Sequence, residues 1–137
     1  MKKRTLIVGA GVLAGVLLAG GLWSRADEFA DEDVERWTQE FMTVVKQGRE
    51  LWTSDQLGTN KVACAQCHPN AANTHPETYP KFQKQLGRVI ALREMINWCL
   101  RNPLEGKPLA LDDLKMVALE AYVTYERRGV PLAPGKH

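Results

Sequence analysis

Apolar residues recur every three or four positions in three stretches of this 137-residue chain. The first stretch runs from Val34 to Trp52, with Gly48 falling in the same series. The second covers residues 89–101 and the third covers residues 114–128. Such spacing places apolar side chains along one face of an α-helix, and no segment shows the alternation typical of a strand. The pattern therefore predicts an all-α fold with three main helices.

Polar and helix-breaking residues at the ends of these stretches indicate where each helix begins and ends. Aspartate side chains accept hydrogen bonds from the free amides of a first turn, whereas Gly and Pro favour termination. The expected caps and stops are Asp31 or Asp33 for the first helix, Asn102-Pro103 for the second, and Asp112, Asp113 and Gly129 for the third. Gly48 lies on a face that must be buried, which predicts close contact with another backbone.

The N-terminus has the organisation of an export signal. Residues 1–4 carry three basic side chains, and residues 6–23 are uncharged and mostly apolar. This pattern predicts a secretory signal peptide over residues 1–26, removed by cleavage after Ala26. The alternative is an uncleaved membrane anchor, because 18 such residues approach the length that spans a bilayer. In both cases residues 27–137 form one folded domain, which we expect to be periplasmic.

The charge of the chain depends on this cleavage. The full chain has a net charge of +2, but removal of residues 1–26 takes away four basic residues and no acidic one. The remaining 14 basic and 16 acidic residues give a net charge of about −2. No basic patch indicates binding to nucleic acid, and we expect contact with a membrane only if the N-terminal segment is retained.

Five residues carry the chemistry of the chain: Cys64-Ala65-Gln66-Cys67-His68. The C-x-x-C-H pattern is the attachment signature of a c-type haem. Two thiols at this spacing add to the two vinyl groups of one porphyrin and become thioethers. The histidine that follows is then held under the iron, where an imidazole nitrogen serves as the proximal ligand. We therefore predict one haem c, bound covalently through Cys64 and Cys67 and ligated by His68.

Two other interpretations of the C-x-x-C pattern are weaker. A zinc site needs a second pair of ligands, and only one further cysteine, Cys99, is present. A thioredoxin-like dithiol is expected within a βαβ unit, and the chain shows no such pattern. A haem also supplies apolar contact area that a domain of about a hundred residues otherwise lacks.

Four residues compete for the position of the sixth iron ligand, with Cys99 preferred. Cys99 lies on the second predicted helix, and a thiolate stabilises ferric iron. The alternative is Met116, although a methionine inside a helix more often packs in a core. Met95 shares a helix face with Cys99, so we expect it beside the haem, and His75 follows His68 too closely to reach the other haem face easily.

Four other side chains are candidate partners of charged groups at the haem site. Trp52 or Tyr79 is a candidate hydrogen-bond donor to a haem propionate. Arg93 or Arg101 would be the partner of an anionic substrate near Cys99.

Several segments resemble known cytochromes. Gly48-x-x-Leu51-Trp52, C-x-x-C-H and Ala121-Tyr122 resemble the class I cytochromes c, which implies a cytochrome c-like fold around a covalently attached haem c. In that family the first and last helices cross at a small residue that faces an aromatic one, here Gly48 and Tyr122.

A second resemblance is more specific and covers roughly residues 48–132. Its motifs are Ile96-Asn97-Trp98-Cys99-Leu100-Arg101-Asn102, Gly106-Lys107-Pro108-Leu109, Asp112, and Met116-Val117-Ala118-Leu119-Glu120-Ala121-Tyr122. These resemble the haem domains of thiosulfate dehydrogenase and of the catalytic cytochrome subunit of the Sox thiosulfate-oxidising system. The resemblance implies that Cys99 is the distal ligand. Thiosulfate dehydrogenases carry two haems, whereas this chain has one C-x-x-C-H, so a second haem would belong to another protein.

Together these observations predict a periplasmic cytochrome that carries single electrons, in sulfur-compound oxidation or in respiration. The alternative is the haem-thiolate subunit of a thiosulfate-oxidising enzyme that acts with a partner cytochrome. We favour the carrier over the enzyme. The expected partners are redox proteins: another cytochrome, an oxidoreductase or a terminal oxidase.

Overall fold

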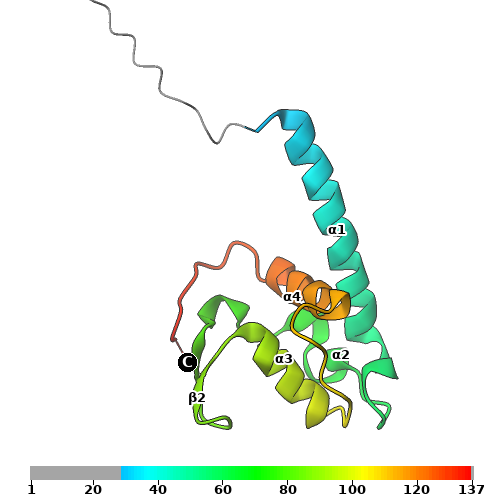
Figure 1. The fold of residues 1–137 in the computed structure, drawn as a ribbon, viewed down its shortest axis with the longest axis vertical. Helices are drawn as coiled ribbons and strands as arrows, with labels where there is room; N and C mark the ends of the chain where they lie inside the picture. The colour runs from blue at the N-terminus through cyan, green and yellow to red at the C-terminus, as the bar shows by residue number, and fades with distance from the viewer. Residues whose placement is uncertain (1–28, 137) are drawn as a thin grey trace, which may run out of the picture.

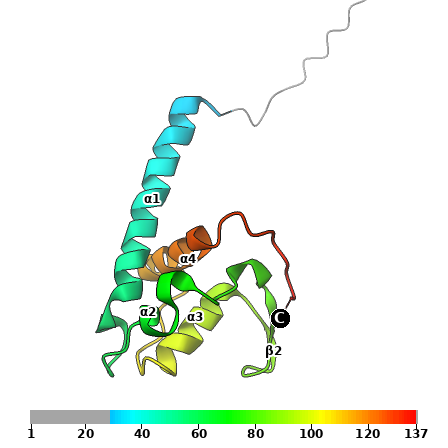
Figure 2. The ribbon, with the colours of Figure 1, turned by 180° about the vertical axis from the view of Figure 1, so that it is seen from behind.

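The computed structural model describes residues 29–136, so the predicted signal peptide over residues 1–26 lies outside the described residues. None of the helices within the described range has the length and apolar character needed to cross a membrane. The long helix α1 (Asp31–Thr53) extends well beyond the rest of the domain at its N-terminal end, as Figures 1 and 2 show from opposite sides. The other elements gather around its C-terminal half.

The core forms where α1 crosses α4 (Leu114–Glu126). A Cβ atom built on Gly48 would lie 1.9 Å from the carbonyl oxygen of Ala118 and 2.7 Å from the Cβ atom of Tyr122. The two helices therefore meet at a separation that only glycine permits. The Trp52 ring packs on Tyr122 with 5.8 Å between ring centroids. The predicted contact between Gly48 and Tyr122 is confirmed.

The third main helix, α3 (Leu92–Arg101), is held by the segment that leads to α4. The buried Asn97 side chain donates a hydrogen bond to the Leu109 carbonyl oxygen and accepts one from the Leu109 amide, both at 2.8 Å. Further along, the Thr59 amide donates to the Leu104 carbonyl oxygen at 3.1 Å. These contacts fix α3 relative to the loop that precedes the C-x-x-C-H motif. The three predicted helices are thus confirmed.

A short antiparallel hairpin was not predicted from the sequence. Strands β1 (Lys81–Gln83) and β2 (Arg88–Ile90) pair in the register Lys81 to Ile90, and Gly87 adopts a positive φ in the turn between them. The helix predicted from residue 89 therefore starts at Leu92 instead. The reason is that Val89 and Ile90 are β-branched and find partners in β1. Apart from this hairpin the regular elements of the described residues are helical, which agrees with the predicted all-α fold class.

The remaining elements are single turns, and one predicted cap is wrong. These turns are η1 (Asp55–Leu57), α2 (Cys64–Cys67), η2 (Pro69–Ala71) and η3 (Pro76–Thr78). Asp113 caps α4, because its carboxylate accepts a hydrogen bond from the Lys115 amide at 2.8 Å. The N-cap of α1, however, is Ala30, and no side chain caps the helix. Asp31 and Asp33 lie inside its first turn, where acidic groups still complement the helix dipole.

The C-terminal segment is tied to η3 and to the residues that follow it. The Ala133 amide donates to the Glu77 carbonyl oxygen at 2.8 Å, and the Gly135 amide donates to the Thr78 carbonyl oxygen at 3.0 Å. The buried Glu77 carboxylate accepts a hydrogen bond from the Arg127 guanidinium at 2.9 Å. This arrangement anchors the loop that forms one end of the cavity described next.

Candidate haem site

A cavity of about 220 Å³ lies between α3 on one side and the segment that carries the C-x-x-C-H motif on the other. Its walls are mostly apolar, with side chains from α1, α3, α4 and the loop after α3. The apolar lining residues are Trp52, Ala63, Leu92, Met95, Ile96, Leu100, Pro103, Leu104 and Val123. Cys64, Cys67, His68 and Cys99 all line the same cavity. The structure therefore brings together every residue of the preferred predicted haem site.

The two cysteines of the motif are placed by the short helix α2. The Gln66 amide donates to the Ala63 carbonyl oxygen at 3.1 Å, and the Ala63 amide donates to Gln66 Oε1 at 3.0 Å. One of the two variable positions of the motif thus caps the turn that presents the thiols. Cys64 is partly buried and Cys67 is exposed at the cavity edge. Burial raises the pKa of the Cys64 thiol to about 11, with the nearby Cys99 adding to the effect.

His68 is oriented by hydrogen bonds that leave one ring nitrogen available. Nδ1 lies 2.8 Å from the Ala72 carbonyl oxygen, so this nitrogen carries the proton and donates it. The lone pair is then on Nε2, as a metal-ligating histidine requires. The Trp52 indole donates to the His68 carbonyl oxygen at 2.9 Å and fixes the backbone. Trp52 is therefore already engaged and does not serve as a free donor to a propionate.

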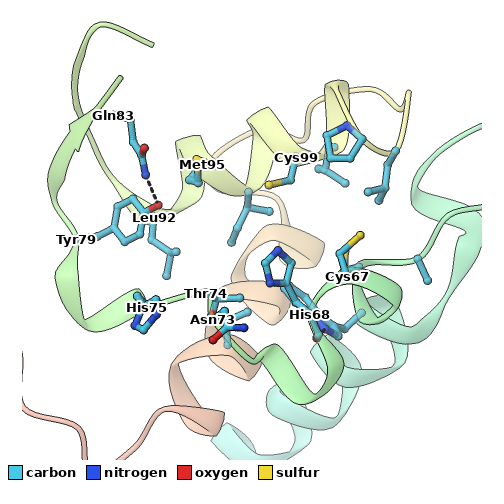
Figure 3. Close-up of a pocket in the computed structure, with 18 of the residues that line it drawn as sticks. Cys67, His68, Asn73, Thr74, His75, Tyr79, Gln83, Leu92, Met95 and Cys99 are labelled. Atoms are coloured by element: carbon cyan, nitrogen blue, oxygen red, sulfur yellow. Dashed lines mark hydrogen bonds between the residues drawn. The ribbon is translucent and has the colours of Figure 1, made fainter. Parts of the chain in front are cut away.

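Cys99 enters the cavity from α3, opposite His68. Figure 3 shows the Cys99 sulfur and the His68 ring pointing into the cavity from its two sides. Burial is the main reason why the pKa of the Cys99 thiol is raised, and the proximity of Cys67 contributes. Met95, one turn earlier on the same helix, also lines the cavity, as predicted. A haem bound here would be held by His68 from one side of the cavity and by Cys99 from the other.

Three residues considered from the sequence do not reach the cavity. Met116 is fully buried in the core and is not among the lining residues. The Arg93 guanidinium instead forms an ion pair with Glu120 at 2.7 Å, and Arg101 is exposed on the far end of α3. The expectation that Arg93 or Arg101 contacts an anion in this site is therefore wrong. Arg93 and Arg101 are close to Cys99 along the chain. Their side chains, however, leave α3 on faces other than the one that lines the cavity.

Other lining residues were not identified from the sequence as site residues. Asn73, Thr74, Lys81 and Gln83 contribute to the cavity, and His75 lies at its edge. Asn73 and His75 have positive φ angles of 60° and 51°, so this loop follows a tightly coiled path. The residues that follow this loop, Glu77, Thr78 and Pro80, accept hydrogen bonds from the C-terminal segment, and no local pattern in the sequence predicts these contacts.

These features fit a haem. The cavity is largely apolar, two thiols lie at one edge, and an oriented imidazole faces a thiol across it. Among residues 29–136, every buried side-chain nitrogen and oxygen has a hydrogen-bond partner. The same range contains no cluster of three or more His, Cys, Asp or Glu residues with the spacing of a metal-ion site. A haem in this cavity would be held by Cys64, Cys67, His68 and Cys99.

Comparison with known proteins identifies the family. A family model described as the SoxA/TsdA cytochrome c domain matches residues 47–132. The chain belongs to this family. A cytochrome c domain implies haem c as the cofactor, in agreement with the cavity. Residues 31–46 of α1, about two thirds of the helix, lie outside the matched range.

Curated relatives and one solved structure extend this result. Thiosulfate dehydrogenase of Allochromatium vinosum is 32% identical over 85 residues, which cover 53% of this chain and 32% of that protein. Thiosulfate dehydrogenase of Psychrobacter arcticus is 29% identical over 105 residues, covering 67% and 32% respectively. This chain thus spans about a third of the length of these relatives. The crystal structure of SoxXA from P. pantotrophus has a TM-score of 0.66 at 19% identity, covering 75% of this chain and 40% of that one, and shows the shared fold.

Proposed function

We propose that this protein is an exported, periplasmic c-type cytochrome that carries single electrons through one haem in sulfur-compound oxidation. The observation that carries the proposal is the pairing of His68 and Cys99 across an apolar cavity edged by Cys64 and Cys67. When bound, a haem supplies one-electron cycling between ferric and ferrous iron. The proposed ligands are His68 on the proximal side and Cys99 on the distal side, with covalent bonds through the two motif cysteines.

The residues around the ligands suit an electron carrier. The hydrogen bond from His68 Nδ1 to the Ala72 carbonyl oxygen holds the imidazole in place and makes it a better donor. A Cys99 thiolate would stabilise the ferric state and give a low reduction potential. His68 is held by its hydrogen bond to Ala72, and Cys99 lies on α3, which Asn97 ties to Leu109, so the chain would keep both groups in place. Small rearrangement is what favours fast electron transfer.

The sulfur-oxidising setting is supported by the family. Relatives that match the larger part of this chain are named thiosulfate dehydrogenases, and the structural match is to SoxXA. The chain spans only about a third of the length of those relatives, so the match covers one region of each of them. We therefore propose that its electrons pass to or from a partner redox protein.

A second candidate function is favoured by Cys99. A thiol beside the haem position, in a chain similar to thiosulfate dehydrogenases, suits the haem-thiolate subunit of an enzyme that oxidises thiosulfate. In that case thiosulfate would reduce the purified protein, or a partner cytochrome mixed with it. A carrier without its own activity would show no reduction by thiosulfate but rapid reduction by a small chemical reductant.

Spectroscopy of the ferric protein tests the ligands. We expect a low-spin EPR signal typical of thiolate ligation, and loss of that signal in a Cys99→Ser variant. A matched Met116→Leu variant should leave the spectrum unchanged, because Met116 lies in the core. A far-red methionine-to-iron band that survives Cys99→Ser would reject Cys99 as the ligand.

Mass spectrometry tests the attachment and the export. The intact protein should carry the mass of one haem and lack residues 1–26. Cys64→Ser and Cys67→Ser should each remove one thioether bond, and the double variant should lose covalent haem altogether. Fractionation of the native host should place the protein in the periplasm. Retention of residues 1–26 together with recovery in the membrane fraction would instead support the anchor.

A further inference from the structure

The two ends of the cavity differ in chemical character. Cys67 lies at one end, whereas Figure 3 shows Tyr79 and Gln83 at the end away from it. Lys81 also lines the cavity, and it is the only lysine or arginine among its described lining residues. The walls between the two ends are mostly apolar. The cavity therefore has a thiol end and a polar end.

A haem likewise has one apolar edge and one charged edge. Its two vinyl groups lie on one edge of the porphyrin and its two propionates on the opposite edge. Covalent bonds from Cys64 and Cys67 would fix the vinyl edge at the thiol end, so the carboxylates would be directed to the polar end. A carboxylate that leaves water needs hydrogen-bond donors or a cation to offset the loss of hydration.

We propose that Tyr79, Lys81 and Gln83 form the binding site for the haem propionates. This inference rests on the proposed function, because it assumes that a haem is attached at Cys64 and Cys67. It assigns these three residues a role in setting the orientation and the potential of the haem.

The geometry of β1 supports this assignment. Lys81 and Gln83 are two positions apart on a strand, so their side chains leave the same face, while the exposed Phe82 leaves the other. Gln83 Nε2 donates to the Tyr79 hydroxyl oxygen at 2.9 Å. Within residues 29–136 the Tyr79 hydroxyl proton has no acceptor, so Tyr79 is left as a donor. The Lys81 Nζ atom lies 4.8 Å from the centre of the Tyr79 ring, which brings its charge to the same end.

The polar end is held in place by distant parts of the chain. Lys81 pairs with Ile90, which is buried just before α3. The Gly135 amide donates to the carbonyl oxygens of Thr78 and Pro80 at 3.0 and 3.1 Å. The donors are thus anchored before any ligand arrives. Burial also raises the pKa of the Tyr79 phenol, so the hydroxyl group keeps its proton at neutral pH.

Resonance Raman spectroscopy of the haem-loaded full chain tests the proposal, because the propionate bending bands report on hydrogen bonds to the carboxylates. Lys81→Met and Tyr79→Phe should each shift these bands. Lys81→Met should also lower the midpoint potential, since removal of a positive charge near the haem favours ferric iron. The matched control is Lys84→Met, which removes an exposed lysine from the same hairpin that does not line the cavity.

The outcomes separate this inference from the proposed function. The propionate site is supported if Lys81→Met and Tyr79→Phe both keep covalent haem and show shifted propionate bands, while the bands of Lys84→Met are unchanged. Covalent haem with wild-type bands in both Lys81→Met and Tyr79→Phe overturns the propionate site and leaves the electron carrier standing. If Lys81→Met changes the rate of reduction by thiosulfate but does not shift the propionate bands, Lys81 binds an external anion instead. That result also overturns the propionate site. A wild-type chain without covalent haem would overturn both proposals.

Discussion

The two halves of α1 have the same sequence pattern but different surroundings. The apolar stripe continues through Val34, Trp37 and Phe41 into Val45 and Trp52. In the second half, Val45 and Trp52 are each 5% exposed, because α4 and the loop after α2 cover them. In the first half, Val34 is 47% exposed and Trp37 is 42% exposed. Within the described residues, the Phe29 ring packs edge-on against the Trp37 ring, with 4.9 Å between ring centroids.

This difference shows what an amphipathic pattern does and does not determine. The spacing of apolar residues defines a helix and the face that favours burial. Burial itself needs a partner, and α4 crosses α1 only in its second half, where Gly48 meets Ala118 and Tyr122. The stabilisation by apolar contacts is therefore concentrated in the half of α1 that faces the haem site.

The largest expected difference between the two halves is at their tryptophans. Trp52→Ala should lower the free energy of unfolding by about 3–5 kcal/mol, because it empties a packed site in the core. It also removes the hydrogen bond to the His68 carbonyl oxygen. Trp37→Ala should cost at most about 1 kcal/mol, since it loses little beyond the contact with Phe29. Guanidinium unfolding of the haem-loaded protein measures both.

Equal losses in the two tryptophan variants would contradict the comparison. They would show that the first half of α1 is covered in solution. A concentration-dependent unfolding midpoint would then identify self-association as the reason.

A smaller effect is expected at the helix crossing. Replacing glycine by alanine inside an exposed helix usually stabilises it by up to about 1 kcal/mol. Gly48→Ala should have the opposite sign and cost about 1–3 kcal/mol, because the new Cβ atom would overlap the Ala118 backbone and force α1 and α4 apart. Glu40→Ala, in the exposed half, is the matched control and should change stability by less than about 0.5 kcal/mol. A stabilised Gly48→Ala protein would mean that the helices do not cross here.

The smallest expected effect compares two ion pairs. The Arg127 guanidinium is the main reason why the pKa of the Glu77 carboxyl is lowered to about 2. The ionised Glu77 carboxylate therefore contributes its full stabilisation above pH 4.5, the pKa of this group in the unfolded chain. This stabilisation is lost as the pH falls from 4.5 towards 2. Glu77→Gln should cost about 1–2 kcal/mol at pH 7 and little at pH 2. Thermal unfolding at a series of pH values measures this difference.

The exposed pair between Arg36 and Asp33, 2.7 Å apart at the start of α1, provides the control for Glu77. Asp33→Asn should change stability by well under 1 kcal/mol at any pH, because water screens an exposed pair. If Glu77→Gln lost the same small amount at pH 7 as Asp33→Asn, the buried contact with Arg127 would not anchor the loop at the polar end of the cavity.

Much of the fold and site could be predicted because the relevant signals are local. The helical periodicity identified α1, α3 and α4, and the C-x-x-C-H motif identified Cys64, Cys67 and His68. Cys99 followed from a resemblance in its surrounding segment, and the structure places it in the same cavity as the motif. The prediction that Arg93 or Arg101 lies in the site was wrong, because two residues close together on a helix can point in different directions.

The sequence by itself determined the helices, the haem motif and the small residue at the helix crossing, because each depends on neighbours within a few positions. Only the tertiary structure decided which half of α1 is buried, since that depends on where α4 crosses α1. It alone also revealed the hairpin that carries Lys81 and Gln83, because two three-residue strands are too short to show a period. The polar end of the cavity arises from contacts between residues about fifty positions apart, such as Glu77 with Arg127. Chain entropy opposes such distant contacts, and packing of the whole domain offsets that cost.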